Sequence, residues 1–100
     1  MIRHIVMWKL KDSAQGKNKR ENLEYIKNML YELPIYIPQI KKLELGFDVL
    51  GSEMSWDAAL VSEFDSMEDL KLYQEHPRHK AVSEYVAKVR EDRAVVDYEF

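Results

Sequence analysis

Apolar and polar residues alternate in several short stretches of the chain, which is the spacing of β-strands. The first stretch covers residues 2–10, and both of its faces are apolar at the centre. That pattern predicts a strand covered on two sides. Further stretches lie at about 40–50, 56–64 and 93–99. The pattern therefore predicts four strands.

Between these strands, apolar residues recur at steps of three and four, which places them on one face of a helix. The first helical segment covers about 17–33. Pro34 is predicted to end it, because proline moves the preceding residue out of the α conformation. A second helix reaches His76, where Pro77 is predicted to begin a new helix that ends near residue 91, since proline suits the first helical position.

The predicted order is βαββαβ with a split second helix, which is the order of a ferredoxin-like α+β fold. In such a fold the helices cover one face of the sheet, and the other face is either polar or covered by a partner. The strands here carry additional aromatic residues, namely Trp8, Trp56, Tyr98 and Phe100. Left uncovered, they would form a large apolar patch. The sequence therefore predicts a homodimer in which two sheets pack face to face.

Composition narrows the class of protein. With 100 residues, 46% hydrophobic and 33% charged, the chain is expected to form one globular domain over residues 1–100. A net charge of −3 argues against nucleic-acid binding, which needs a basic surface. No apolar run approaches the roughly 20 residues of a membrane span. Without cysteine or a signal-peptide pattern at its start, the chain is expected to be cytoplasmic.

His79 and Tyr73 are the best candidates for catalysis. His79 would lie in the first turn of the helix that begins at Pro77, where the helix dipole disfavours its protonation. A neutral imidazole can act as a general base. Tyr73 could donate a hydrogen bond to a carbonyl or enolate oxygen. The pair would suit proton abstraction next to a carbonyl group; alternatively, Tyr73 belongs to the core and His79 binds a backbone carbonyl.

Four further residues are candidates for substrate binding. His4 lies among apolar neighbours on the first strand, so it is either a buried structural histidine or a group that orients a ligand. His76 either caps the following helix or contacts the substrate. Trp8 and Trp56 could wall an aromatic pocket, or they could belong to the core or an interface.

Neither a metal nor a cofactor is expected. His76 and His79 are three residues apart, but Pro77 interrupts the helix between them, and no HExxH pattern is present. The chain also lacks a glycine-rich phosphate loop and a GxSxG motif. Nucleotide chemistry and serine hydrolysis are therefore poor candidates.

Five segments spread over the whole chain carry a family resemblance. They are MIRHIVMWKL (1–10), IP (37–38), LVSEFDS (60–66), YQEHPRH (73–79) and VVDYE (95–99). With these segments the sequence resembles the stress-responsive A/B barrel (Dabb) family. The resemblance implies a ferredoxin-like subunit and a dimeric α+β barrel.

The resemblance also implies a pocket. Some members are linked to stress responses, and a plant member acts as a polyketide cyclase. Its catalytic tyrosine and histidine match Tyr73 and His79, and a pocket histidine matches His4. A further pocket histidine on the third strand is replaced here by Ala58. This departure argues against the same substrate.

Three classes of function follow from these observations. The first is a site for a small hydrophobic carbonyl or aromatic compound, with cofactor-free acid–base chemistry of a cyclase or lyase kind. The second is a non-catalytic dimer with a role in stress response or assembly, whose pocket would be filled by its own side chains and whose His79 would bind backbone. The third, a monooxygenase-like enzyme, rests on fold analogy alone.

Overall fold

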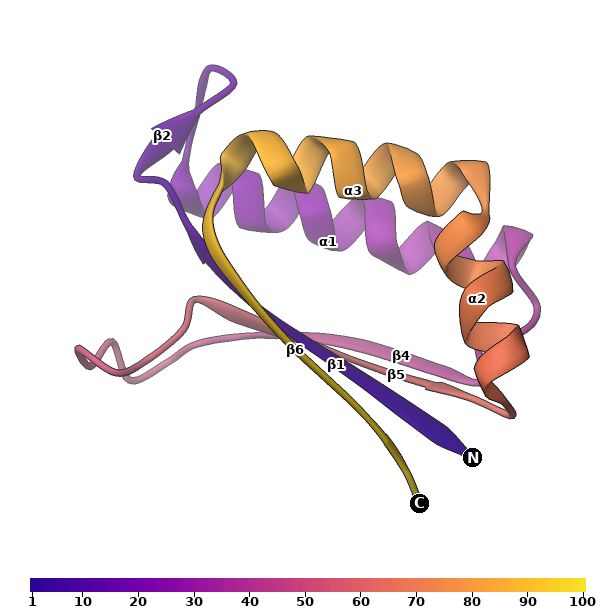
Figure 1. Ribbon diagram of the computed structural model, residues 1–100. Coiled ribbons are helices and arrows are strands. Elements are labelled where there is room, and N and C mark those ends of the chain that lie inside the picture. The colour runs from indigo at the N-terminus through magenta and orange to yellow at the C-terminus, as the bar shows by residue number, and fades with distance from the viewer.

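The computed structural model describes residues 1–100, and its centre is a four-stranded antiparallel sheet (Figure 1). The strands are β1 (Ile2–Leu10), β4 (Lys42–Phe47), β5 (Ala58–Phe64) and β6 (Arg90–Glu99), and a short hairpin is formed by β2 (Ser13–Ala14) and β3 (Lys17–Asn18). The sheet order is β4-β5-β1-β6. Strand β1 is therefore hydrogen-bonded on both sides, whereas β6 is an edge strand.

Three helices lie on one side of this sheet. They are α1 (Lys19–Tyr36), α2 (Met67–Glu75) and α3 (Pro77–Val89). Figure 1 shows α1 and α3 side by side over the sheet, with α2 descending from the start of α3 towards it. The element order and topology confirm the ferredoxin-like α+β fold with a split second helix.

Helix α1 differs from the sequence prediction at both ends. It begins at Lys19 because Asn18 and Glu21 form a capping box, in which each side chain accepts from the other residue's backbone N–H. It also passes through Pro34, which was predicted to end it. The prediction failed because Leu33 and Ile37, at 2% and 1% exposure, anchor the last turn in the core. Burial outweighs the local preference there.

The strand boundaries also shift by a few residues. Strand β4 covers Lys42–Phe47 rather than 40–50, and β5 begins at Ala58, so Trp56 lies in the preceding loop. Helix α3 ends at Val89 rather than near 91, because Arg90 already pairs with Leu10 of β1. Strand β6 is therefore longer at its start than predicted.

The two faces of the sheet have different environments. Along β1 every second residue is buried under the helices, and His4 and Trp8 are on this face. Trp8 was grouped with the residues of the uncovered face on sequence, and the structure corrects this placement. The opposite face is open in the single chain, and Val96, Tyr98 and Phe100 are exposed. The core thus lies between the sheet and the helices, and the cavity described next lies beside it.

Candidate functional site

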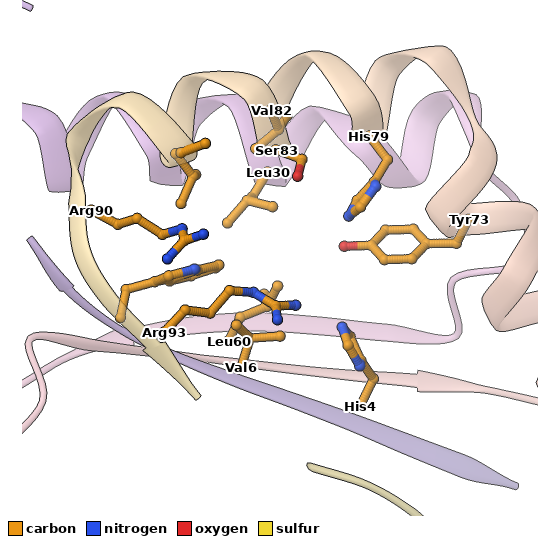
Figure 2. A pocket seen from close by; sticks show the side chains of 13 residues that line it. His4, Val6, Leu30, Leu60, Tyr73, His79, Val82, Ser83, Arg90 and Arg93 are labelled. Carbon is orange, nitrogen blue, oxygen red and sulfur yellow. The ribbon is translucent and has the colours of Figure 1, made fainter. Parts of the chain in front are cut away.

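A cavity of about 240 Å³ lies between the sheet and helix α3 (Figure 2). This volume is below the roughly 300–1,000 Å³ of pockets for drug-sized ligands, so the cavity fits a smaller molecule. Of the 13 residues that line the cavity, 8 are hydrophobic. The ring and guanidinium groups in the lining are His4, Trp8, Tyr73, His79, Arg90 and Arg93. The structure therefore brings together four of the six predicted site residues, namely both predicted catalytic residues and two predicted substrate-binding residues.

Tyr73 comes from helix α2 and directs its hydroxyl into the cavity (Figure 2). The side chain is 0% exposed, and its ring packs against Phe64 with centroids 5.0 Å apart. The hydroxyl has no hydrogen-bond partner in the protein. Burial raises the pKa of this hydroxyl above its ordinary value, so it keeps its proton at neutral pH. Tyr73 is therefore a neutral donor without an acceptor.

His79 lies in the first turn of α3, with its ring 4.4 Å from the Tyr73 ring, centroid to centroid. Its Nδ1 is 3.1 Å from the carbonyl oxygen of Gln74. A neutral ring that donates this hydrogen bond has its lone pair on Nε2, the nitrogen that Figure 2 shows directed towards the cavity. Burial lowers the pKa of His79 below 6.5. The ring is thus neutral at pH 7, as predicted, but burial is the largest cause.

His4 approaches the cavity from the sheet side and is 3% exposed. Its Nδ1 is hydrogen-bonded to the carboxylate of Asp97 on the neighbouring strand β6. This contact orients the ring and leaves Nε2 for the cavity, towards which the ring points in Figure 2. Asp97 was not among the predicted site residues. It acts here as a positioning residue for His4.

Trp8 supplies a second buried donor without a partner. Its indole Nε1 makes no hydrogen bond in the protein, and the side chain is 6% exposed. An indole N–H can only donate. A buried donor without an acceptor costs about 1–3 kcal/mol, and such groups are rare in folded proteins. Trp8 and Tyr73 both line the same cavity, so a ligand with acceptor atoms would satisfy them together.

Trp56 and His76 lie outside this cavity. Trp56 faces a shallow hollow on the opposite side of the sheet, with Lys9 Nζ 5.0 Å from its ring centroid. His76 caps helix α3, where its Nδ1 accepts from the backbone N–H of Arg78 at 3.1 Å. Neither side chain reaches the groups around Tyr73. The capping alternative for His76 is thus the one that the structure shows.

Sequence reasoning missed Arg90 and Arg93, which also line the cavity. Both belong to the first four residues of β6, and Arg93 lies opposite Trp8 across the strand pair. The pairing of β6 with β1 is the signal that could have found Arg93, because Asp97 lies opposite His4 and residues an even number apart on a strand share a face. Arg90 could not have been found in this way, because the register shifts between Lys9 and Leu10.

The chain has no group of three or more histidine, cysteine or acidic side chains that could hold a metal ion. None of its helices is both long and apolar enough to cross a membrane. The cavity itself is open rather than filled by its own side chains. The non-catalytic alternative predicted a filled pocket, and the cavity differs from that prediction. That alternative also predicted that His79 binds backbone, and one nitrogen of His79 does so.

Comparisons with known proteins agree with the fold. The family described as the stress responsive A/B barrel domain matches residues 2–100. An uncharacterized protein of Streptomyces coelicolor is 32% identical over 102 residues, and the match covers 100% of this chain and 100% of that protein. A dimeric protein of unknown function with a ferredoxin-like fold, from Bacteroides fragilis, is 39% identical, with 99% of this chain and 95% of that chain covered and a TM-score of 0.88.

A more distant structure is a hydroxynitrile lyase from Passiflora edulis. It is 20% identical, with 97% of this chain and 90% of that chain covered and a TM-score of 0.81. At that identity the likeness shows the fold alone. The match over residues 2–100 and the Streptomyces relative show more, and they confirm the resemblance seen in the sequence: the chain belongs to the stress-responsive A/B barrel family.

Proposed function

We propose that the cavity binds a small carbonyl compound and that Tyr73 and His79 move a proton on the carbon next to its carbonyl group, without a cofactor. One observation carries the proposal. The Tyr73 hydroxyl is fully buried and has no partner, and it lies beside a histidine whose pKa is lowered. A donor and a base at one small cavity are the two groups that enolate chemistry needs.

The reaction uses the two groups in complementary ways. Nε2 of His79 takes the proton from the carbon, and the electrons of that C–H bond become the enolate. Its negative charge develops on the former carbonyl oxygen, where the Tyr73 O–H donates a hydrogen bond. Because burial raises the pKa of Tyr73, this group stays a hydrogen-bond donor throughout. Return of the proton from His79 to the carbon regenerates the carbonyl compound and can invert that carbon or exchange its hydrogen. In a cyclisation the enolate carbon would instead bond to a second carbonyl carbon, and the alkoxide formed there would take the proton from His79.

Proton exchange in heavy water tests the proposal directly. Aromatic and polyketide-like carbonyl compounds are incubated with the protein, and deuterium incorporation at the carbon next to the carbonyl is followed by NMR. We expect protein-dependent exchange for at least one compound that raises the melting temperature, since a ligand of the folded state must stabilise it. Binding without exchange for every stabilising compound would contradict catalysis and favour a binding protein.

The pH dependence of exchange should follow His79. Burial lowers the pKa of His79 below 6.5, and the charges of His4, Arg93 and His76 act in the same direction, against the carbonyl of Gln74. The base is active when neutral, so the rate is expected to rise with pH through a midpoint below 6.5 and then level off. A midpoint above 6.5 would contradict His79 as the base.

The same pKa shift affects stability. Protonation of His79 is disfavoured in the folded chain, so the unfolded chain binds more protons as the pH falls below 6.5. His79 therefore reduces the free energy of unfolding on acidification, and its effect levels off below its pKa in the folded protein.

The open face of the sheet supports a second, structural proposal, that two chains pack sheet to sheet. Ile5 and Met7 of β1 are half-buried there, and Val96, Tyr98 and Phe100 are exposed. The Bacteroides relative is dimeric. An apolar surface of this kind on a sheet is typical of a protein–protein interface.

A charge on that face should separate the dimer. Val96 is 52% exposed on the open face, and Val95, at 48%, lies next to it on the helix side. We expect Val96→Asp to halve the mass measured by light scattering at micromolar concentration, because it would bury an unpaired carboxylate. Val95→Asp is the matched control and should leave the mass unchanged. Equal masses for both variants would contradict sheet-to-sheet packing.

A further inference from the structure

The two arginines that line the cavity have no ion-pair partner in the protein. Figure 2 shows the guanidinium group of Arg90 at the end of the cavity away from Tyr73 and His79, whereas the side chain of Arg93 extends along the cavity towards His4. Neither takes part in any of the ion pairs of the chain. By contrast Arg3, on the open face, is paired with Glu63 at 2.9 Å. Two unpaired cations therefore share one small space.

The charge of the cavity is opposite to that of the whole chain. The chain carries a net charge of −3, yet no aspartate or glutamate lines the cavity. The two unpartnered donors, Trp8 Nε1 and the Tyr73 hydroxyl, also require acceptors. Positive charge together with unsatisfied donors, beside an apolar wall, favours a ligand that is anionic and rich in oxygen.

The site fits a carboxylate better than a phosphate. The planar guanidinium group matches either anion with two parallel hydrogen bonds, so the choice rests on the surroundings of the arginines. Arg90 is the C-cap of α3, so the end of the cavity lies near the negative end of that helix. This field disfavours a second negative charge. The chain also offers no glycine-rich loop of backbone N–H groups, which phosphate sites commonly use.

We infer that the ligand of this cavity is a small carboxylic acid that also carries a carbonyl group, and that Arg90 and Arg93 bind its carboxylate. This inference rests on the proposed function and adds the substrate class. With the carboxylate held by Arg93, whose side chain extends towards His4, a carbonyl group next to that carboxylate would lie on the side of Tyr73 and His79. The arginines thus decide which end of the ligand reaches the catalytic pair.

A matched pair of probes tests the inference. Phenylpyruvate has a carboxylate beside its ketone and exchangeable protons on the next carbon, and phenylpyruvamide is its neutral isostere. We expect wild type to bind the acid about tenfold or more tightly in calorimetry, the effect of one charge-assisted contact. Arg93→Gln and Arg90→Gln should each reduce that preference, and the double variant should abolish it. Added salt should weaken acid binding, because Arg93 is exposed.

Lys80→Gln is the control, because it removes a positive charge from an exposed position of α3 that does not line the cavity. It should leave the preference for the acid unchanged. Equal affinity for both probes, or a preference that survives in the double variant, overturns the carboxylate inference. If both probes then still exchange deuterium, the proposed function stands without it. If neither probe binds wild type, the inference fails for this class of ligand.

Discussion

Phenylalanine in place of Tyr73 is expected to make the protein more stable and nearly inactive. The hydroxyl is buried without a partner, so removing it relieves a desolvation cost of about 1–3 kcal/mol. The phenyl ring keeps its contacts with Phe64 and His79. For a domain of this size, 1 kcal/mol corresponds to roughly 4–8 °C in melting temperature. We therefore expect Tyr73→Phe to melt several degrees higher at equal protein concentration.

The same change removes the donor to the enolate oxygen. Loss of one such donor lowers rates by about 10²–10³ in other enzymes. We expect Tyr73→Phe to lower the rate of deuterium exchange by that order. A donor that serves only the fold would behave in the opposite way, because its loss would lower the melting temperature. The combination of higher stability and lower activity is therefore specific to a group held ready for a ligand.

Tyr85→Phe is the matched control within the same chain. The Tyr85 hydroxyl donates to Oδ1 of Asn22 at 2.5 Å, and Asn22 is 0% exposed. Removing this donor takes a hydrogen bond away from the buried Oδ1 of Asn22, so the variant should melt at a lower temperature. Its exchange rate should stay near that of wild type. A lower melting temperature for Tyr73→Phe as well would contradict the site and would assign Tyr73 to the core alone.

The fold could be predicted because its signals are local and repeated. The alternation in β1 sets one face of the sheet, and the residue steps in α1 and α3 set the faces that cover it. Tyr73 and His79 could also be found, since Pro77 separates two helices and leaves both residues next to the break.

The rest of the site could not be predicted from local patterns. The same holds for one part of the fold. Whether α1 ends at Pro34 depends on the burial of Leu33 and Ile37, which is a property of the whole core. The roles of Asp97 and Arg93 depend on the register of β6 against β1, which pairs residues about 90 positions apart in the chain. Alternation in β6 alone does not show that the partner of Asp97 is His4.

The second large effect is expected for His79→Gln. Glutamine can still donate to the carbonyl of Gln74, so the local contact at 3.1 Å can persist, but an amide does not take up a proton. Loss of a general base lowers rates by about 10²–10⁴. We expect the exchange rate to fall by that order and the affinity for a bound carbonyl compound to change little. The acidic limb of the pH profile should disappear with it.

Two other histidine variants make this result specific. His76→Asn keeps a good helix cap and lies outside the cavity, so its exchange rate should stay near that of wild type. His4→Gln tests the other imidazole that faces the cavity. If exchange survives in His79→Gln but not in His4→Gln, the base is His4, whose ring the carboxylate of Asp97 orients. The Nδ1 partners lead us to expect the reverse. His79 donates to the neutral carbonyl of Gln74, and burial lowers its pKa, so its Nε2 is free to accept a proton at neutral pH. His4 is held by the carboxylate of Asp97 and is better suited to orient a bound oxygen.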